Sequence, residues 1–464
     1  MKLSRAILAT ALTAALAGCG GEGNSSPPPV VGSPAPAPTP SPTPTPSPTP
    51  SPPSAEITFL HVFGIEETDG AEPSDPLVQA SDGNFYGVTP SGGANRCNDG
   101  KQSCGTLYRM TPGGDVTILH HFSQAPHDGW WPHGALIQAS DGALYGATIS
   151  GGTYNRGTIY RVTLSGTFTV LHSFGEPGSQ GNRPHGRLLE ASDGNFYGAT
   201  IGGGTSDCGQ YGEDCGTIFK LTPAGQHSVI YEFGVDPANG VVPNGSLTEG
   251  SDGSLYGTTR VAGNDACSAF EQIAGCGTLF RLTKSGQIST LHTFSGEPDD
   301  GAVPYGPVSI GPDGAMYGTT YFGGGGVCLA WASCGTVFRL DGEGDLEIIH
   351  AFAVPGEDGT GTQDEGYHPM PYLTVGSDGN LYGTTESGGL LATERTGVIF
   401  RMTTGGDLTV LYRFGLLSEE PSYPAGGVVQ GSDGAFYGTT FYNGKLGAVG
   451  PRAGQGAAYR LTVE

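Results

Sequence analysis

Apolar and polar positions repeat along the chain with a long period. Seven segments of the form Asp-Gly-x-(apolar)-Tyr-Gly lie 52 to 65 residues apart, and they begin at Asp82, Asp141, Asp193, Asp252, Asp313, Asp378 and Asp433. Each unit contains four apolar runs of strand length, which in the second unit cover 134–140, 143–148, 157–163 and 167–174. The Asp-Gly between the first two runs is typical of a β-hairpin turn, because both residues tolerate positive φ. Four antiparallel strands joined by short turns make one propeller blade, and a period of this length favours that architecture.

The two ends of the repeated region complete one another. The last unit stops after the apolar run at 455–461 and lacks a fourth run, whereas the run at 57–63, before the first unit, has the sequence of a fourth strand. Pairing the two removes the open sheet edges that would otherwise invite aggregation. An open solenoid would need atypical polar units at its ends, and none is visible. We expect an all-β protein, a seven-bladed β-propeller of four-stranded antiparallel blades over 57–464, in which the strand at 57–63 completes the seventh blade.

The composition agrees with an all-β fold and limits the classes of binding partner that we expect. With 82 glycines there is little room for long helices, because Gly costs about 1 kcal/mol relative to Ala in a helix interior. A hydrophobic fraction of 36% is too high for a disordered chain. The 20 basic and 44 acidic residues give a formal net charge of −24 without a basic cluster, so nucleic acid is not expected as a partner.

The first 18 residues have the pattern of an export signal. Lys2 and Arg5 precede an apolar run at 7–16, which is too short to span a bilayer as a mature helix. The run ends in Leu-Ala-Gly-Cys, which resembles a bacterial lipobox, and the resemblance implies that Cys19 is acylated and becomes the new N-terminus. Gly20 in place of an aspartate implies sorting to the outer membrane. We expect a lipoprotein signal peptide at 1–18 and an exported protein that is anchored to the membrane by a lipid on Cys19.

Residues 19–56 have the composition of a tether. Fourteen prolines lie between Pro27 and Pro53, mostly alternating with Ser and Thr. Such a run favours the extended polyproline II conformation and has no apolar face on which to fold. The predicted organisation is therefore a signal peptide at 1–18, a lipidated and disordered tether at 19–56, and a propeller at 57–464.

The repeat resembles a known family. The order Asp-Gly-x-(apolar)-Tyr-Gly-Thr-Thr, then Cys-Gly-Thr-x-Phe-Arg-Leu, runs from Asp252 to Leu282 and again from Asp313 to Leu340. It is similar to the GloVer tandem repeat of secreted bacterial proteins, over residues 57–464. The resemblance implies an exported repeat protein, often surface-anchored, and brings no catalytic residues with it.

Eight cysteines remain after Cys19, and they form four local pairs. Each pair precedes the third strand of its blade, and the pairs are Cys97/Cys104, Cys208/Cys215, Cys267/Cys276 and Cys328/Cys334. Short loops in an oxidising compartment predict disulfides. Zinc would require four convergent ligands, whereas these pairs belong to different blades, so we expect neither a metal nor a cofactor.

Positions that differ among otherwise similar units are the ones that the fold does not dictate. The residues on either side of the proline that begins each first strand vary, as does the residue after each second strand. Both sets should face one mouth of the central channel, where aromatic, His and Arg side chains suggest a binding site. The candidate ligand-binding residues are Trp131, His133, Arg183, His185, Asn244, Arg260, Tyr305, Tyr321, His368, Glu386 and Tyr423. The alternative interpretation is that these are loop residues that have drifted.

Two classes of function remain open. The favoured one is a monomeric, surface-displayed binding or scaffold module for carbohydrate or protein ligands, with aromatic side chains as stacking platforms. The alternative is a polysaccharide-active enzyme, most plausibly a uronate lyase. In that reaction Arg183 or Asn244 would neutralise the uronate, His133 or His185 would abstract the proton, and Tyr305 would donate one. A glycosidase would need two facing carboxylates, for which Glu72, Asp75 and Glu386 are the candidates on this face.

Overall fold

The computed structural model describes residues 55–65, 68–175, 181–204, 208, 215–263, 275–325, 334–353, 365–388, 396–415, 420–442 and 455–464. These residues belong to a unit that spans 52–464. The predicted signal peptide at 1–18, the predicted lipidation site Cys19 and residues 20–54 of the predicted tether lie outside the described residues. Within the described part of the chain, no helix has the length and apolar character needed to cross a membrane.

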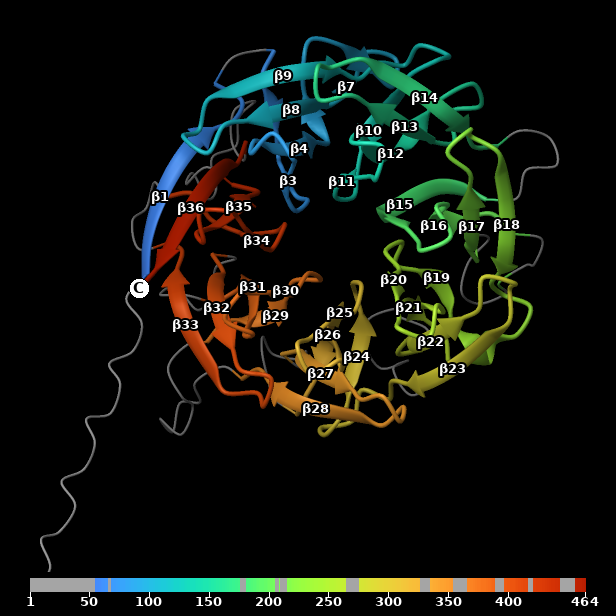
Figure 1. Cartoon of the computed structure of the whole chain (residues 1–464), viewed down its shortest axis with the longest axis vertical. Helices are drawn as coiled ribbons and strands as arrows, with labels where there is room; N and C mark the ends of the chain where they lie inside the picture. The colour runs from blue at the N-terminus through green and yellow to red at the C-terminus, as the bar shows by residue number, and fades with distance from the viewer. Residues whose placement is uncertain are drawn as a thin grey trace, which may run out of the picture. The chain divides into compact units, whose positions relative to one another are not determined.

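Seven antiparallel sheets stand around a central channel as the blades of a propeller (Figure 1). Blade 1 consists, from the channel outward, of β3 (Val78–Gln79), β4 (Phe85–Thr89), β8 (Thr106–Met110) and β9 (Val116–His121). Blade 2 consists of β10 (Gly129–Pro132) with β11 (Ile137–Gln138), then β12 (Leu144–Gly151), β13 (Thr158–Val162) and β14 (Phe168–Ser173). Blade 3 consists of β15 (Asn182–Glu190), β16 (Phe196–Gly202), β17 (Thr217–Leu221) and β18 (His227–Glu232).

Blades 4 to 7 repeat the order. Blade 4 consists of β19 (Val241–Pro243) with β20 (Thr248–Glu249), then β21 (Leu255–Val261), β22 (Thr278–Leu282) and β23 (Ile288–Thr293), and blade 5 of β24 (Gly301–Pro304) with β25 (Ser309–Ile310), then β26 (Met316–Gly323), β27 (Thr336–Leu340) and β28 (Leu346–Ala351). Blade 6 consists of β29 (Tyr367–Pro369) with β30 (Thr374–Val375), then β31 (Leu381–Ser387), β32 (Val398–Met402) and β33 (Leu408–Arg413). Blade 7 consists of β34 (Val428–Gln430), β35 (Phe436–Thr440), β36 (Ala457–Val463) and β1 (Ala55–Val62). Two small ribbons, β2 (Gly70–Ala71) with β5 (Ser91–Gly92) and β6 (Arg96–Cys97) with β7 (Gln102–Ser103), extend blade 1.

The N-terminal strand closes the ring, as predicted. β1 pairs antiparallel with β36, with Ile57 opposite Leu461 and Phe59 opposite Tyr459, and the two strands run side by side in Figure 1. The strand begins at Ala55, two residues inside the predicted tether. The seventh blade is therefore built from both ends of the propeller.

The Asp-Gly segment of each unit folds into the hairpin between the first two strands. In blade 2, Asp141 Oδ1 accepts the backbone N–H of Ala143 at 3.0 Å, and Oδ2 accepts the hydroxyl of Tyr145 at 3.0 Å. Arg161 of β13 donates to the same Oδ2 at 2.7 Å. The turn and tyrosine contacts recur in the other six blades. The repeated aspartate is thus a structural residue of the blade.

The first strand of a blade differs from the prediction. The run at 134–140 was expected to form one strand, but in blade 2 the ladder consists of β10 and β11, separated by residues 133–136. Pro132 has no N–H to donate, and Trp131 (φ 60°) and Gly134 (φ 93°) leave the extended conformation. The residue before the repeated proline has a φ between 55° and 64° in every blade, and the seven are Glu72, Trp131, Arg183, Val242, Val303, His368 and Tyr423. For a residue with a Cβ this conformation costs roughly 1–2 kcal/mol.

A contact between neighbouring blades holds this conformation in place. The N–H of each of these seven residues donates, over 2.8–3.0 Å, to a carbonyl of the preceding blade, and the acceptors are Gln455, Cys104, Arg156, Cys215, Cys276, Cys334 and Thr396 in turn. The ring of the proline then covers the glycine that follows the acceptor. At Gly216, for example, an added Cβ would lie 2.4 Å from Pro243 Cδ and 2.5 Å from the Thr200 carbonyl oxygen. We call this hydrogen bond and its proline–glycine contact the inter-blade lock.

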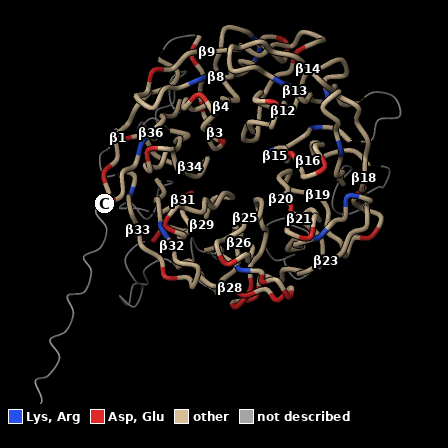
Figure 2. Tube along the Cα trace, in the orientation of Figure 1, with Lys and Arg blue, Asp and Glu red and all other residues tan. Residues whose placement is uncertain are grey.

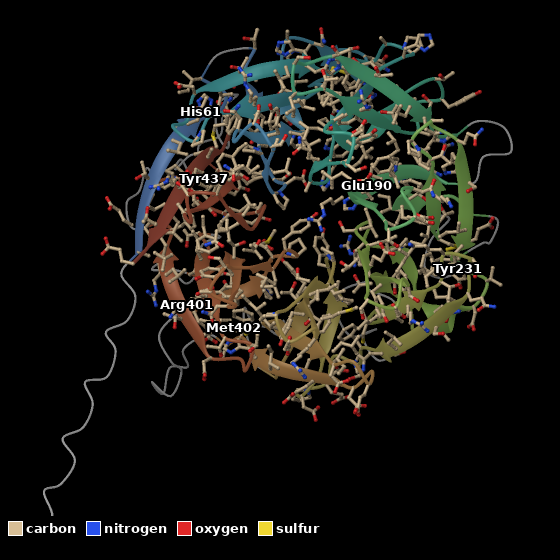
Figure 3. All side chains as sticks on the ribbon, viewed as in Figure 1. His61, Glu190, Tyr231, Arg401, Met402 and Tyr437 are labelled. Carbon is tan, nitrogen blue, oxygen red and sulfur yellow. A yellow bond between two sulfur atoms is a disulfide. The ribbon has the colours of Figure 1, made fainter. Side chains whose placement is uncertain are left out.

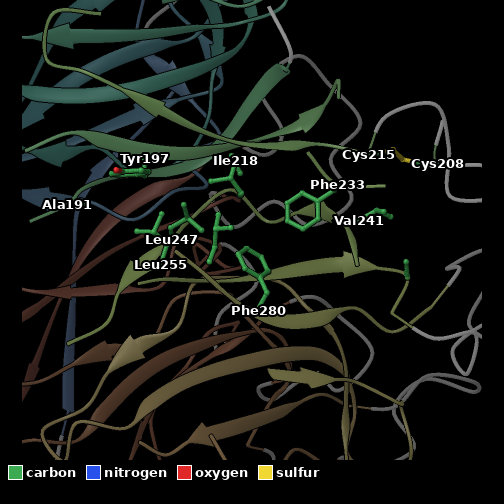
Figure 4. Packing of buried hydrophobic residues seen from close by; sticks show 13 residues of the cluster. Ala191, Tyr197, Cys208, Cys215, Ile218, Phe233, Val241, Leu247, Leu255 and Phe280 are labelled. Atoms are coloured by element: carbon green, nitrogen blue, oxygen red, sulfur yellow. A yellow bond between two sulfur atoms is a disulfide. The ribbon is translucent and has the colours of Figure 1, made fainter. Parts of the chain in front are cut away.

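Apolar side chains fill the space between blades. Between blades 3 and 4, Tyr197, Ile218 and Phe233 meet Leu247, Leu255 and Phe280 in one buried cluster (Figure 4). Full burial of such a side chain stabilises the fold by about 1.5–3 kcal/mol. Because each cluster draws on two blades, a blade is not stabilised by its own side chains alone.

Histidines of the fourth strand form polar links at the perimeter. His61, His120 and His292 contact the carboxylates of Asp69, Asp128 and Asp300 at 3.1–3.2 Å, and His350 lies 3.4 Å from Glu365. Tyr231, which replaces histidine in the fourth strand of blade 3, accepts a hydrogen bond from the side-chain amide of Asn239. Figure 3 shows His61 and Tyr231 on the outermost strands. These side chains fix the chain that leads into the next blade.

Two of the four predicted disulfides lie wholly in the described residues and are formed, Cys97–Cys104 and Cys208–Cys215. Cys276 and Cys334 are also disulfide-bonded. Their predicted partners, Cys267 and Cys328, lie outside the described residues. In each blade concerned, the second cysteine directly precedes the glycine of the inter-blade lock.

The inter-blade lock predicts that two chemically identical substitutions have different effects. Gly194→Ala in a hairpin turn (φ 73°, no atom within 4 Å of the added Cβ) should cost about 1–2 kcal/mol of unfolding free energy. Gly216→Ala carries the same backbone cost and also forces Pro243 and Thr200 apart, so it should cost about 1–3 kcal/mol more. Urea unfolding of the two variants measures the difference. Equal losses would contradict the lock.

Candidate functional site

A cavity of about 420 Å³ lies at one mouth of the central channel, and all seven blades contribute to its wall. Most of the lining comes from the residues around the repeated proline of each first strand. Pro90 and Phe441, which follow the second strands of blades 1 and 7, line it as well. The volume falls in the range of about 300–1,000 Å³ that is usual for small-molecule sites.

The structure brings six of the eleven predicted ligand-binding residues to this cavity. They are Trp131, His133, His185, Asn244, Tyr305 and Tyr423. Trp131 is the most accessible of them, with 44% of its surface exposed. Its rare backbone conformation is held by the inter-blade lock, so its position at the rim follows from the fold.

The other five predicted residues do not line the cavity. The guanidinium of Arg260 lies over the ring of Tyr305, 5.3 Å from its centroid, and so supports a lining residue from behind. His368 stacks on Tyr321 at 4.4 Å, and the Tyr321 hydroxyl donates to Glu386. His368 and Glu386 are buried.

Arg183 is the fifth of these residues. Its Nε donates to the side chain of Asn182 at 3.2 Å. Side-chain direction at these positions depends on the local backbone conformation, which the sequence pattern does not specify. Five of the eleven predicted residues are therefore outside the cavity wall.

Asp75 is the most unusual group in the cavity wall. Only 6% of its surface is exposed, and Oδ2 is buried without a hydrogen-bond partner. Burial raises the pKa of Asp75 to about 6, against the smaller opposing influences of His185 and the backbone N–H of Gly134. A carboxyl group with a pKa close to neutrality in a concave site is typical of binding and catalytic residues.

Two histidines lie beside this carboxyl group. His133 Nδ1 is 3.7 Å from Asp75 Oδ1, and the rings of His133 and His185 stack with their centroids 4.4 Å apart. Burial lowers the pKa of His133 to about 4, and burial together with His133 lowers that of His185 to about 3. Both imidazoles are thus uncharged at neutral pH. The Nδ1 atom of each is buried without a hydrogen-bond partner.

Blades 5 to 7 give the cavity an aromatic side. Tyr305, Tyr372, Tyr423 and Phe441 line it there. Burial, followed by the nearby charge of Asp75, raises the pKa of Tyr372 to about 12, so its hydroxyl remains protonated. The cavity therefore combines flat apolar surfaces with a small number of hydrogen-bonding groups.

In the sequence analysis Asp75 appears only as one of three candidate carboxylates, but comparison of the repeats gives a stronger indication of its role. The repeated proline is followed two residues later by glycine in five units, at Gly134, Gly186, Gly245, Gly306 and Gly426. Blade 1 has Asp75 at this position and blade 6 has Pro371. The fold therefore does not require the carboxyl group, and comparison of the seven units at this position would have identified it.

The buried carboxyl group should lower the stability of the protein at neutral pH. Because its pKa is higher in the folded state than the ordinary value of 3.8, ionisation destabilises the fold as pH rises from about 4 to about 6. Asp75→Asn should therefore raise the unfolding free energy by about 1–3 kcal/mol at pH 7.5 and leave it nearly unchanged at pH 4. Chemical denaturation at the two pH values measures this. A variant that is less stable at pH 7.5 would show that the carboxylate is favourably paired.

Known proteins with solved structures share the fold. The chain aligns with a streptogramin B lyase at 16% identity and a TM-score of 0.52, covering 88% of this chain and 98% of the other. It aligns with virginiamycin B lyase from Staphylococcus aureus at 16% identity and a TM-score of 0.50, covering 88% and 99%. Likeness at this level of identity shows the propeller fold alone. None of the curated protein sequences compared with the chain matches it.

The sequence itself matches one repeat family. The Gloeobacter/Verrucomicrobia repeat matches at residues 96–274, 209–366 and 266–464, which together cover most of the propeller. This confirms the resemblance that the Asp-Gly and Cys-Gly-Thr segments indicated. The chain belongs to the Gloeobacter/Verrucomicrobia repeat family, and it builds that repeat into a closed seven-bladed β-propeller.

Proposed function

We propose that this protein is an exported, envelope-anchored β-propeller that binds carbohydrate in the cavity at its channel mouth. The cavity is the observation that carries the proposal. Sugars present apolar C–H faces, which stack on aromatic rings such as those of Trp131, Tyr305 and Tyr423, and hydroxyl groups, which bond to polar side chains. The cavity supplies both kinds of contact.

The size of the cavity favours a small ligand over a folded protein partner. A stable protein–protein interface needs about 800 Å² from each partner. The site in the propeller is instead a concave space of about 420 Å³ at the channel mouth. A short polymer segment that enters the mouth fits this shape.

The uronate-lyase alternative receives less support from the geometry. Arg183, expected to neutralise the uronate, is not among the lining residues, and the amide nitrogen of Asn244 donates to Thr258 Oγ1 and the Pro304 carbonyl. No lysine or arginine is found among the described residues that line the cavity. An acidic sugar would lack a counter-ion there, so we propose binding without a catalytic step.

Binding in the cavity predicts a specific loss. Trp131→Ala combined with Tyr305→Ala should reduce affinity for the bound glycan by at least about tenfold, because each ring removes a stacking surface. Glycan-array screening followed by calorimetry measures this. Tyr154→Ala is the matched control, since Tyr154 is 41% exposed and lies outside the cavity lining. Full affinity in the double variant, or an equal loss in the control, would place the ligand elsewhere.

The envelope anchor rests on the signal pattern at 1–18 and on Cys19. If Cys19 carries the lipid, Cys19→Ser should move the protein from the membrane fraction to the soluble fraction, because the acyl chains supply the membrane affinity. Cell fractionation and labelling with a fatty-acid analogue measure this. A Cys19→Ser protein that stays in the membrane fraction would contradict the anchor.

A further inference from the structure

We propose that Asp75 is the counter-ion for an amino group of the ligand, so that the cavity selects amino sugars with a free amine over neutral or acidic sugars. The inference rests on the proposed carbohydrate function and specifies its ligand class. It starts from a carboxyl group that the repeat does not need and that the fold nevertheless buries.

The first step is the charge of the cavity wall. Among the described lining residues, the acidic side chains are Glu72 and Asp75, and neither lysine nor arginine is present. Glu72 already accepts a hydrogen bond from Ser91 at 2.8 Å. Two arginines outside the lining, Arg260 over the Tyr305 ring and the exposed Arg187, add positive charge near His185 and Tyr372. In the wall itself, an ammonium group still meets two acidic side chains and no lysine or arginine, which favours it over a uronate.

The second step is the number of hydrogen bonds that the cavity leaves unmade. Asp75 Oδ2, His133 Nδ1 and His185 Nδ1 are all buried without a partner. A neutral imidazole has one N–H and one lone pair, so each Nδ1 can accept a hydrogen bond from a ligand when the ring proton is on Nε2.

An ammonium group matches these atoms. It carries three N–H donors and no acceptor. The carboxyl group and the two stacked rings are adjacent, with 3.7 Å between His133 Nδ1 and Asp75 Oδ1. A hydroxyl group has a single donor and would leave two of the three acceptors unbonded. The carboxylate oxygen and the two imidazole nitrogens therefore suit a primary amine better than a neutral sugar.

The third step is the surroundings of the amine. Aromatic faces attract cations as well as sugar C–H groups. Tyr305 already binds one cation, the guanidinium of Arg260, on its face. Acidic and basic residues are interspersed around the blades (Figure 2), and the net charge of −24 gives the whole protein a field that favours cationic ligands.

Calorimetry on the whole protein tests the inference with three sugars of equal length at neutral pH. The probes are glucosamine oligosaccharides with free amines, N-acetylglucosamine oligosaccharides, and galacturonate oligosaccharides. We expect the free-amine sugar to bind about 10- to 100-fold more tightly than the N-acetylated one, as for a charge-assisted hydrogen bond, and the galacturonate most weakly.

Two variants isolate the carboxyl group. Asp75→Asn keeps its shape without the charge, and Asp75→Gly installs the residue that five other units carry, so both should fold, which thermal unfolding verifies. Both should abolish the preference for the free amine, so that the ratio of the affinities for the free-amine and N-acetylated sugars falls to about one. Asp99→Asn removes an exposed charge outside the cavity lining and should change neither.

The outcomes separate the two proposals. If wild type binds the N-acetylated and free-amine sugars equally, or if the preference survives in Asp75→Asn or is lost equally in Asp99→Asn, the role of Asp75 is overturned and the carbohydrate function stands. If none of the three sugars nor any glycan of the array binds, the carbohydrate function itself falls, and the amine inference falls with it.

Discussion

The structure depends on one contact repeated between all neighbouring blades. The N–H of the residue before each repeated proline reaches a carbonyl of the preceding blade, and the proline ring covers the glycine beside that carbonyl. The contact joins blade 1 to blade 7 through Glu72 and Gln455 in the same way as it joins consecutive blades. It therefore closes the ring and fixes the spacing of the blades, and it does so with backbone atoms that the variable side chains do not disturb.

Because backbone atoms hold the blades together, the side chains at the same positions can vary and form a binding site. Because the backbone holds residues such as Trp131 and Tyr423 in a left-handed conformation, their side chains are free to differ from unit to unit. Strain of this kind tends to accumulate at functional sites, where surrounding structure compensates for it. Three of the seven such positions, Glu72, Trp131 and Tyr423, line the cavity. Asp75, which replaces a glycine, is then an addition to the scaffold that lowers its stability at neutral pH.

Much of the fold could be predicted from the sequence, because it is encoded in repeats. Asp-Gly hairpins fixed the strand order, and the unmatched run at 57–63 fixed the closure. Two features could not be predicted. In blade 2 the first strand is divided into β10 and β11, and nothing in the sequence indicates the positive φ of Trp131, a residue with a Cβ. A sequence places a residue on a strand but does not say which side chain covers another, so it could not show that the cavity wall leaves out Arg183, Arg260, Tyr321, His368 and Glu386.

Amide hydrogen exchange tests the central claim most directly. The seven N–H groups of the inter-blade lock share one environment in the structure, so the amide of Glu72, whose acceptor lies in the last blade, should exchange as slowly as those of Val242 and Val303. Protection of Glu72 equal to that of the other six is the predicted result. An amide at Glu72 that exchanges at the rate of an exposed loop while Val242 and Val303 remain protected would show that the ring is open between its first and last blades.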